Sequence, residues 1–337
     1  MSATFHARLI HEPFGDPGLF VRLQWEGRAL LFDIGDLSPL PAGELLRVTD
    51  VFVSHTHMDH FVGFDQLLRL ILGREKALRL FGPPGILANV EGKVQGYTWN
   101  LVDSYPLILE VREVHPTEVR GALFRCRERF KRYDLEIVPF DGTLLDEPLF
   151  SVQAVHLDHG IPCLGFALEE KAHLNIDKGR LDLLGWPVGP WLGELKQRIR
   201  DGAPDEAPFV ARWKRNGEVE ERTFALGALK AELVRITPGQ KLAYVTDIRY
   251  SPENHRKVVA LARNADLFFC ETMYAGQDHE MAQERNHLTA GQAGALAREA
   301  NAKRLLPFHF SPRYRDQLEL LLREAQEAFG ELITESS

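Results

Sequence analysis

The most chemically informative stretch of the sequence is a run of imidazole and carboxylate side chains directly after a short apolar segment. Four of the six residues from 55 to 60 are potential metal ligands, namely His55, His57, Asp59 and His60. Imidazole nitrogens and carboxylate oxygens are the usual protein ligands of zinc and similar divalent ions. Val51–Ser54 is expected to form a buried strand, and alternate residues of an extended chain share a face. The spacing therefore predicts a divalent-metal site just after this strand.

One metal ion needs about four ligands, and a catalytic site keeps one position open, so the cluster predicts further ligands elsewhere in the chain. Three candidates each stand at the end of an apolar segment expected to be a strand: His159, Asp247 and His309. Seven ligands suit two metal ions that share a carboxylate, and Asp247 is the natural bridge. Two ions about 3.5–4 Å apart can activate water and stabilise charge on a phosphoryl or carbonyl group. These residues predict a metal-dependent hydrolase.

The apolar pattern indicates how such ligands would be positioned. The first 170 residues consist mainly of expected strands, and strands alternate with helices from residue 241 onward. This order predicts an α/β (α+β) protein with sheets packed between helices and with catalytic groups on loops at strand ends. Between 171 and 236 the periodicity weakens and proline-containing turns appear. We expect one domain over residues 1–337, in which 171–236 is an inserted arm without a core of its own.

Three segments carry specific local predictions. A helix is expected over Thr289–Asn301, with Thr289 as its cap and Gln292 completing a capping box. A strand is expected at Leu135–Pro139, and a final helix over Arg313–Phe329.

Bulk composition narrows the class of protein. The net charge of −8 argues against broad, non-specific attraction to nucleic acid, although basic residues gather between Arg120 and Arg132. The three cysteines are widely separated, which predicts neither a disulfide framework nor a thiolate metal site. No apolar run is long enough to cross a bilayer, so a soluble, cytoplasmic protein without a membrane partner is expected.

Beyond the cluster, several segments resemble one family. The His-x-His-x-Asp-His run at 55–60 resembles the metallo-β-lactamase superfamily, and other segments resemble its ribonuclease Z branch, the zinc endonucleases that trim the 3′ end of precursor tRNA. The segments are Leu31–Asp36, Phe81–Gly85, Asp158–Pro162 and the stretch from His287 to Tyr314. They span residues 31–314, which is most of the chain. The resemblance implies a four-layer αββα sandwich with an inserted arm.

The resemblance also implies roles for single residues. It implies His55, His57 and His159 at one zinc ion, Asp59, His60 and His309 at the other, and Asp247 between them. Asp59 would also orient or deprotonate the attacking water, and His287 would donate a proton to the leaving oxygen. Zinc is the metal that the resemblance implies, and the same ligands also accept manganese or iron.

Substrate and assembly follow from the same resemblance. Arg313 would contact a phosphate, and Gly189 and Pro190 would belong to an arm that grips tRNA. Precursor tRNA is then the expected partner, and the chain is expected to form a homodimer.

Other functions remain open from the residues alone. The same metal site suits hydrolysis of a small phosphodiester, ester, thioester or lactone, which the acidic net charge favours. The chain also differs from the branch at Met58 and at Asp36–Ser38, near the expected site. A di-iron redox protein usually carries glutamate where this chain has His57. A binding protein without catalysis would have no need of seven ligands.

Overall fold

The computed structural model describes residues 4–24, 26–171, 173–215 and 218–330. The chain divides into two compact units, and each is described here by itself. The main unit comprises Met1–Leu144, Val152–Leu168 and Lys241–Ser337. The small unit comprises Leu145–Ser151 and Glu169–Gln240. No helix among the described residues is long and apolar enough to span a membrane.

The first sheet of the main unit comes from the N-terminal part of the chain. Within the described residues it has nine strands in the order β1-β2-β3-β4-β5-β6-β7-β8, with β9 paired to β7. The strands are β1 (Phe5–Leu9), β2 (Leu19–Leu23), β3 (Ala29–Phe32), β4 (Val48–Phe52), β5 (Ala77–Gly82), β6 (Ile108–Val114), β7 (Glu118–Arg125), β8 (Lys131–Asp134) and β9 (Val138–Pro139). All four residues of β3 are buried, as expected for a strand covered on both faces.

The second sheet joins the middle of the chain to its C-terminal part. In the described residues its order is β10-β11-β12-β17-β18-β19. The strands are β10 (Thr143–Asp146), β11 (Phe150–Asp158), β12 (Pro162–Glu170), β17 (Lys241–Val245), β18 (Leu267–Glu271) and β19 (Leu305–Phe308). Strands β17, β18 and β19 run parallel, so their carboxyl ends meet at one edge of the sheet.

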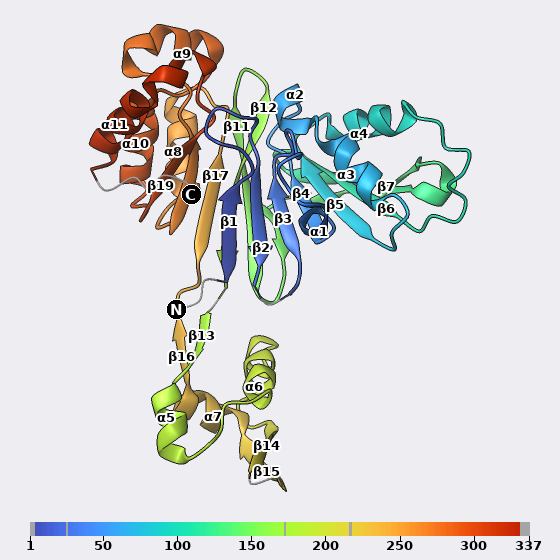
Figure 1. The fold of residues 1–337 in the computed structure, drawn as a ribbon, viewed down its shortest axis with the longest axis vertical. Coiled ribbons are helices and arrows are strands. Elements are labelled where there is room, and N and C mark those ends of the chain that lie inside the picture. Colours follow the sequence, from blue (N-terminus) through green and yellow to red (C-terminus); the bar gives the residue numbers. More distant parts are fainter. Residues whose placement is uncertain (1–3, 25, 172, 216–217, 331–337) are drawn as a thin grey trace. The chain divides into compact units, whose positions relative to one another are not determined.

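Helices cover the outer faces of the two sheets (Figure 1). Beside the first sheet lie α1 (Ala42–Leu45), α2 (Met58–Phe61), α3 (Phe64–Ile71) and α4 (Ile86–Gln95). Beside the second sheet lie α8 (Pro252–Leu261), α9 (His279–Arg285), α10 (Ala290–Glu299) and α11 (Leu318–Phe329). Short 3₁₀ turns occupy Cys126–Glu128, Gly276–Asp278 and Pro312–Gln317. Each helical layer shares an apolar core with its own sheet.

Aromatic side chains fill the space between the sheets. The ring of Phe166 on β12 lies 5.7 Å from that of Phe32 and 5.8 Å from that of Phe52, on the first sheet. The Tyr244 ring on β17 lies 6.0 Å from Phe32. Aromatic pairs at such separations add to the stabilisation that burial itself provides. The main unit is therefore a four-layer αββα sandwich, which confirms the expected fold.

Most local predictions are confirmed and two are wrong in part. The capping box of Thr289 and Gln292 is present at the start of α10, and all three cysteines are free and buried. Only Val138–Pro139 of the expected Leu135–Pro139 strand is a strand, because this segment is largely exposed and its alternation does not reflect burial. The last helix begins at Leu318, because Tyr314 has non-helical backbone angles after Pro312. Helix α4 was missed.

The small unit has an architecture of its own. Strands β13 (His173–Ile176) and β16 (Val234–Thr237) form one antiparallel pair, and β14 (Pro208–Arg215) and β15 (Glu218–Ala225) form another. Its helices are α5 (Lys178–Leu184), α6 (Trp191–Arg200) and α7 (Leu226–Leu233). Ten buried residues of these elements form an apolar cluster that includes Trp191, Phe209 and Trp213. The expectation that 171–236 has no core of its own is therefore wrong, because three tryptophans and regularly spaced leucines supply one.

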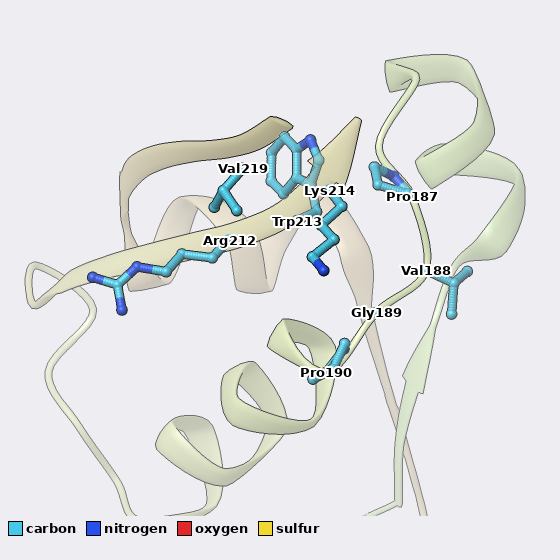
Figure 2. A pocket seen from close by; sticks show the side chains of 8 residues that line it. All are labelled: Pro187, Val188, Gly189, Pro190, Arg212, Trp213, Lys214 and Val219. Atoms are coloured by element: carbon cyan, nitrogen blue, oxygen red, sulfur yellow. The ribbon is translucent and has the colours of Figure 1, made fainter. Parts of the chain in front are cut away.

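A pocket of about 470 Å³ opens on the small unit (Figure 2). Eight residues line it, namely Pro187, Val188, Gly189, Pro190, Arg212, Trp213, Lys214 and Val219. The Trp213 ring packs against the Trp186 ring in a stacked arrangement, with the ring centroids 6.1 Å apart. The pocket therefore combines an aromatic ring with two cationic side chains from β14, of which Arg212 pairs with Glu221 of β15 at 2.6 Å.

Candidate metal centre

Strand ends deliver the predicted ligands to one region of the main unit. Strands β3, β4 and β5 are parallel, and His55 follows β4. On the other sheet, His159 follows β11, and Asp247 and His309 follow the parallel strands β17 and β19. Asp247 and His309 adopt left-handed backbone angles, with φ of 49° and 58°. Such angles cost about 1–3 kcal/mol in non-glycine residues and are commonest at functional sites.

Two glycines hold the turn that carries Asp59 and His60. A Cβ atom on Gly35 would lie 2.3 Å from the Asp59 carbonyl oxygen, and one on Gly63 would lie 2.2 Å from the Gly35 oxygen. Only glycine allows backbone segments to approach this closely. The His60 carbonyl also accepts a hydrogen bond from Ile34 at 2.9 Å. The loop after β3 therefore fixes the position of α2.

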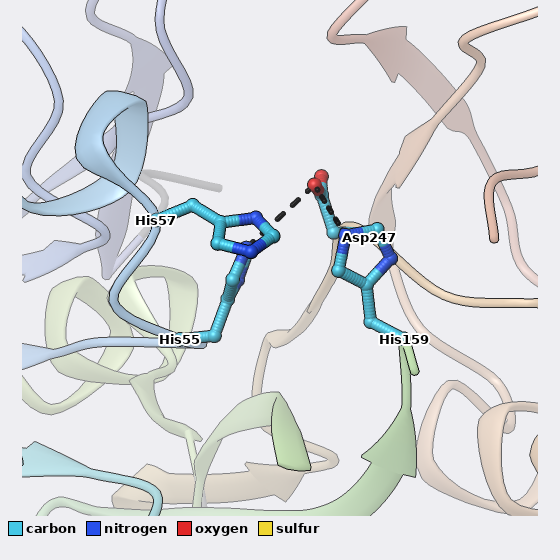
Figure 3. A group of neighbouring side chains, drawn as sticks. All are labelled: His55, His57, His159 and Asp247. Atoms are coloured by element: carbon cyan, nitrogen blue, oxygen red, sulfur yellow. Dashed lines mark ion pairs between the residues drawn. The ribbon is translucent and has the colours of Figure 1, made fainter. Parts of the chain in front are cut away.

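The first group of candidate ligands consists of three imidazoles and one carboxylate (Figure 3). Its members are His55, His57, His159 and Asp247, and each offers a ligand atom within 4.8 Å of the others. The Asp247 Oδ2 atom lies 3.7 Å from His55 Nε2 and 3.4 Å from His159 Nε2. The imidazoles of His55 and His57 are in contact, with ring centroids 4.4 Å apart.

The second group lies next to the first and shares its carboxylate. Asp59, His60 and His309 offer ligand atoms within the same 4.8 Å limit. His60 Nε2 is 3.6 Å from Asp59 Oδ2 and 3.5 Å from Asp247 Oδ2. His309 Nδ1 is 2.8 Å from Asp247 Oδ1. The structure thus brings all seven predicted side chains together, with Asp247 touching members of both groups.

Unsatisfied nitrogen atoms test whether these side chains suit a metal. His55 Nε2 and His60 Nε2 are buried, and neither has a hydrogen-bond partner among the residues that the structure describes. A buried polar atom without a partner costs about 1–3 kcal/mol, so native proteins rarely leave several together. Divalent metal ions accept lone pairs from such nitrogens. The donor set therefore fits divalent-metal binding.

Burial and neighbouring charges move the pKa values of the ligands in different directions. For the protein alone, burial, aided by neighbouring imidazoles, lowers the pKa of His55 to about 2, so this ring is neutral and keeps its lone pair. Burial raises the pKa of Asp59, but the His309 hydrogen bond and the His60 charge outweigh it and bring the pKa to about 2. Burial opposes charge on His309, yet Asp247 raises its pKa to about 9. In the protein alone, His55 is therefore neutral, whereas the protonated His309 pairs with the Asp247 carboxylate, so metal binding at His309 requires the loss of its proton.

A buried aspartate supports the second group, and sequence reasoning missed it. Asp33 is fully buried after β3 and accepts hydrogen bonds from His60 Nδ1 at 2.9 Å and from the Tyr244 hydroxyl at 3.0 Å. It also accepts from the backbone N–H and hydroxyl of Ser54. A carboxylate on Nδ1 leaves Nε2 of the same ring as the ligand atom and fixes its direction.

A second missed carboxylate supports His287. Glu271, at the end of β18, is fully buried and accepts a hydrogen bond from His287 Nδ1 at 2.7 Å and one from the Ile248 backbone at 2.7 Å. The His287 ring lies 4.9 Å from that of His159. Burial opposes its charged form, but Glu271 raises the pKa of His287 above the usual value. Asp247 was predicted because it is an acid at the end of an expected strand. Asp33 and Glu271 meet the same criterion, so this signal could have identified them.

The other predicted site residues, Arg313, Gly189 and Pro190, belong to neither ligand group. The Arg313 guanidinium lies near Asp278, at 3.8 Å, and contacts Met281 and the Tyr314 ring. Gly189 and Pro190 line the pocket of the small unit.

The basic stretch from Arg120 to Arg132 is largely neutralised by neighbouring acids. Arg120 pairs with Glu118, and Arg125 and Arg127 pair with Glu128. Arg132 pairs with Glu91 and Asp134. We therefore give this stretch a smaller part in substrate binding than the sequence suggests.

Two facing sheets between helices, with a His/Asp cluster at their strand ends, define a metallo-β-lactamase-fold protein that binds divalent metal. A family model described as a β-lactamase superfamily domain matches residues 230–310. Among solved structures, the metallo-β-lactamase fold protein YhfI from Bacillus subtilis has a TM-score of 0.56 at 18% identity, covering 98% of this chain and 95% of that one. The short form of human tRNase Z has a TM-score of 0.52 at 20% identity, covering 92% and 93%. These likenesses show the fold.

Sequence relatives narrow the class. Ribonuclease Z of Deinococcus radiodurans is 32% identical over 96% of this chain and 95% of that relative. Ribonuclease Z of Methanosarcina acetivorans is 27% identical over 93% of this chain and 88% of its own length. The chain belongs to the ribonuclease Z family, and it is a hydrolase.

Proposed function

We propose that this protein is an endoribonuclease that cleaves the 3′ trailer from precursor tRNA with two divalent metal ions. The observation that carries the proposal is the pair of ligand groups that share Asp247, beside His287 with its Glu271 partner. Relatives named ribonuclease Z, which match nearly the whole chain, support RNA as the substrate.

Two metal ions, zinc in the first instance, would be held by the two groups. His55, His57 and His159 would hold one, Asp59, His60 and His309 the other, and Asp247 would contact both. Manganese or iron would suit the same ligands. When bound, such a metal pair lowers the pKa of water and stabilises the charge that develops on the phosphoryl group.

The chain's own side chains supply the remaining chemistry. The ionised Asp59 carboxylate, 44% exposed, is the group of the cluster best placed to orient water and accept its proton. Glu271 accepts the proton of His287 Nδ1, so that Nε2 of the same ring faces the leaving 3′ oxygen and donates to it. Asp33 keeps the His60 ring oriented through Nδ1.

Substrate recognition is assigned to other residues. In the small unit, Gly189 and Pro190 shape a pocket beside Trp213, Arg212 and Lys214, which suits the faces of bases and the charge of phosphates. Arg313 is assigned to a phosphate contact, for which its guanidinium would exchange Asp278 for substrate. A homodimer in the cytoplasm completes the proposal.

One experiment tests this function directly. The metal content of the purified chain is measured together with cleavage of a precursor tRNA and of bis(p-nitrophenyl) phosphate, for the parent chain and for Asp59→Ala. We expect about two metal ions per chain, a cut at the trailer junction, and loss of both activities in the variant. A metal-loaded chain that cleaves neither phosphodiester would overturn the proposal. Cleavage of the small phosphodiester alone would point to a small-molecule substrate instead.

A further inference from the structure

The loop after His159 contains a position without a side chain where two other segments converge. Gly160 is exposed and has a φ of +82°. A Cβ atom placed there would lie 2.8 Å from Nδ2 of Asn286 and 3.6 Å from Nη2 of Arg249. The bare glycine therefore lets two nitrogen donors, one from each of the other segments, come close to the backbone of this loop. The consecutive Cα atoms of His159 and Gly160 are about 3.8 Å apart, so this part of the loop adjoins the candidate metal centre.

Asn286 Nδ2 and Arg249 Nη2 donate no hydrogen bond to another group among the described residues. Among the described residues, no group accepts a hydrogen bond from the Asn286 amide, whereas its backbone oxygen accepts one from His159 Nδ1 at 2.9 Å. Arg249 is held on one side, where its Nε lies 3.3 Å from Asp158 Oδ2 and its backbone N–H donates to the Asp158 oxygen. The side chain is 43% exposed, and Nη2 remains directed towards Gly160.

The chemistry of this pair selects an anion. The Asn286 amide and the Arg249 guanidinium near Gly160 are both N–H donors, and the Asp158 carboxylate beside them is engaged by Arg249 Nε and by the Gly160 N–H, which donates to it at 2.7 Å. Guanidinium and amide donors together are a common way of binding phosphate oxygens. Asn286 adjoins His287 and Arg249 follows Asp247 by two residues, so both donors are fixed to segments that carry the site.

We propose that Arg249 and Asn286 bind the backbone phosphate next to the one that is cleaved. The scissile phosphate has to lie at the His/Asp group itself, and the donor pair stands at the residue next to His159, whose Nδ1 donates to the Asn286 backbone oxygen. The pair would set which linkage of the strand reaches the metal centre. This inference rests on the proposed RNA substrate.

The test measures binding separately from cleavage. A fluorescent precursor tRNA with a non-hydrolysable phosphonate at the cleavage position is titrated against the metal-loaded chain over a range of salt concentrations. Arg249→Gln is expected to weaken binding about tenfold, the usual value of a charge-assisted hydrogen bond. It should also reduce the slope of log Kd against log salt by about 0.7, as one lost phosphate contact on a single strand does. Arg249→Lys should keep the slope.

A second variant and a matched control complete the design. Asn286→Asp keeps the size of the side chain and tolerates the left-handed backbone, yet presents acceptors to the phosphate, so it should weaken binding at least as much. Arg256→Gln, an exposed arginine on α8, should bind as the parent does. Metal content and hydrolysis of bis(p-nitrophenyl) phosphate should stay unchanged in all variants.

The outcomes are distinct. Unchanged affinity and slope in both Arg249→Gln and Asn286→Asp would overturn the inference. The inference would also be overturned if metal content or hydrolysis of bis(p-nitrophenyl) phosphate fell as much as tRNA binding does. Arg249 would then only support the His159 loop through Asp158. Failure of the proposed function would appear in the parent chain, as a lack of precursor tRNA cleavage, before any variant is compared.

Discussion

The candidate metal centre and the pocket of the small unit differ in how firmly their side chains are held. In the metal centre, Asp247 is 3% exposed and His60 is fully buried between Asp33 and the ligand groups. In the pocket, Val188 is 68% exposed and the Arg212 side chain is 66% exposed. Reaction chemistry needs groups fixed within a fraction of an ångström, whereas recognition of a large flexible substrate needs accessible surface.

This difference has an energetic consequence. Side chains that share buried partners act as a unit, so removing one disturbs all the others. Exposed side chains that share no partner contribute nearly independently. We therefore expect substitutions in the metal centre to cause large losses of activity on every substrate. Substitutions in the pocket should cause modest losses of activity on precursor tRNA alone.

The largest effect is expected from Asp247→Ala. This change removes the carboxylate common to both groups, which leaves His309 without its nearest acid and His60 with Asp33 alone at 2.9 Å on its other nitrogen. We expect metal content to fall and hydrolysis of both precursor tRNA and bis(p-nitrophenyl) phosphate to drop by about 10³-fold or more. Elemental analysis and initial rates measure the two effects. Asp103→Ala, at an exposed position of the same unit, is the control. Full metal content with full activity would show that Asp247 is not a ligand.

His287→Ala should separate proton donation from metal binding. Loss of a general acid slows a reaction by about 10²–10⁴-fold. We expect this loss with precursor tRNA, whose leaving 3′ oxygen needs a proton. A much smaller loss is expected with bis(p-nitrophenyl) phosphate, because p-nitrophenolate leaves without one. Metal content should be unchanged. Equal losses on the two substrates, or loss of metal, would assign His287 a structural role.

A smaller loss is expected from Glu271→Gln. The carboxylate accepts from both His287 and Ile248, and glutamine offers only one acceptor oxygen for the two donors. Losing one such hydrogen bond corresponds to about tenfold in rate. The loss should again be confined to precursor tRNA. A thermal unfolding scan separates this outcome from general destabilisation, which would lower both activities alike.

The sequence predicted the chemistry of the metal centre better than its support. Four potential ligands in one short run are easy to recognise. Because metal ions need more ligands than this run supplies, the sequence also pointed to His159, Asp247 and His309. The partners Asp33 and Glu271 also stand at strand ends, but nothing in the neighbouring sequence distinguishes an acid that supports a ligand from an ordinary strand terminus. Their role depends on which strands become neighbours, because Asp33 meets Tyr244 across 211 residues of sequence.

The small unit shows the opposite limit. Its weak periodicity led to the expectation of an arm without a core, whereas Trp191, Trp213 and Phe209 are buried together. A small core built from a few large aromatic residues does not require regularly spaced apolar residues. Apolar periodicity, which indicates long helices and strands, therefore does not reveal such a core. Gly189 and Pro190 were found only through the family resemblance. Their neighbours Arg212 and Lys214 come from a hairpin that the sequence did not indicate.

The smallest effect, and the one that most sharpens the contrast, is expected from Arg212→Gln combined with Lys214→Gln. Both side chains line the pocket and neither belongs to the apolar cluster of the small unit, so the unit should stay folded. Loss of two phosphate contacts should raise KM for precursor tRNA about tenfold, reduce the salt slope by about 1.4 to 1.8, and leave kcat unchanged. Hydrolysis of bis(p-nitrophenyl) phosphate should not change, because this small substrate has no second phosphate for the pocket to bind. Lys178→Gln combined with Arg180→Gln, both at exposed positions on α5, controls for the same loss of two positive charges. If the control raises KM for precursor tRNA as much as the double variant does, the overall charge of the small unit attracts the RNA and the pocket does not bind it specifically.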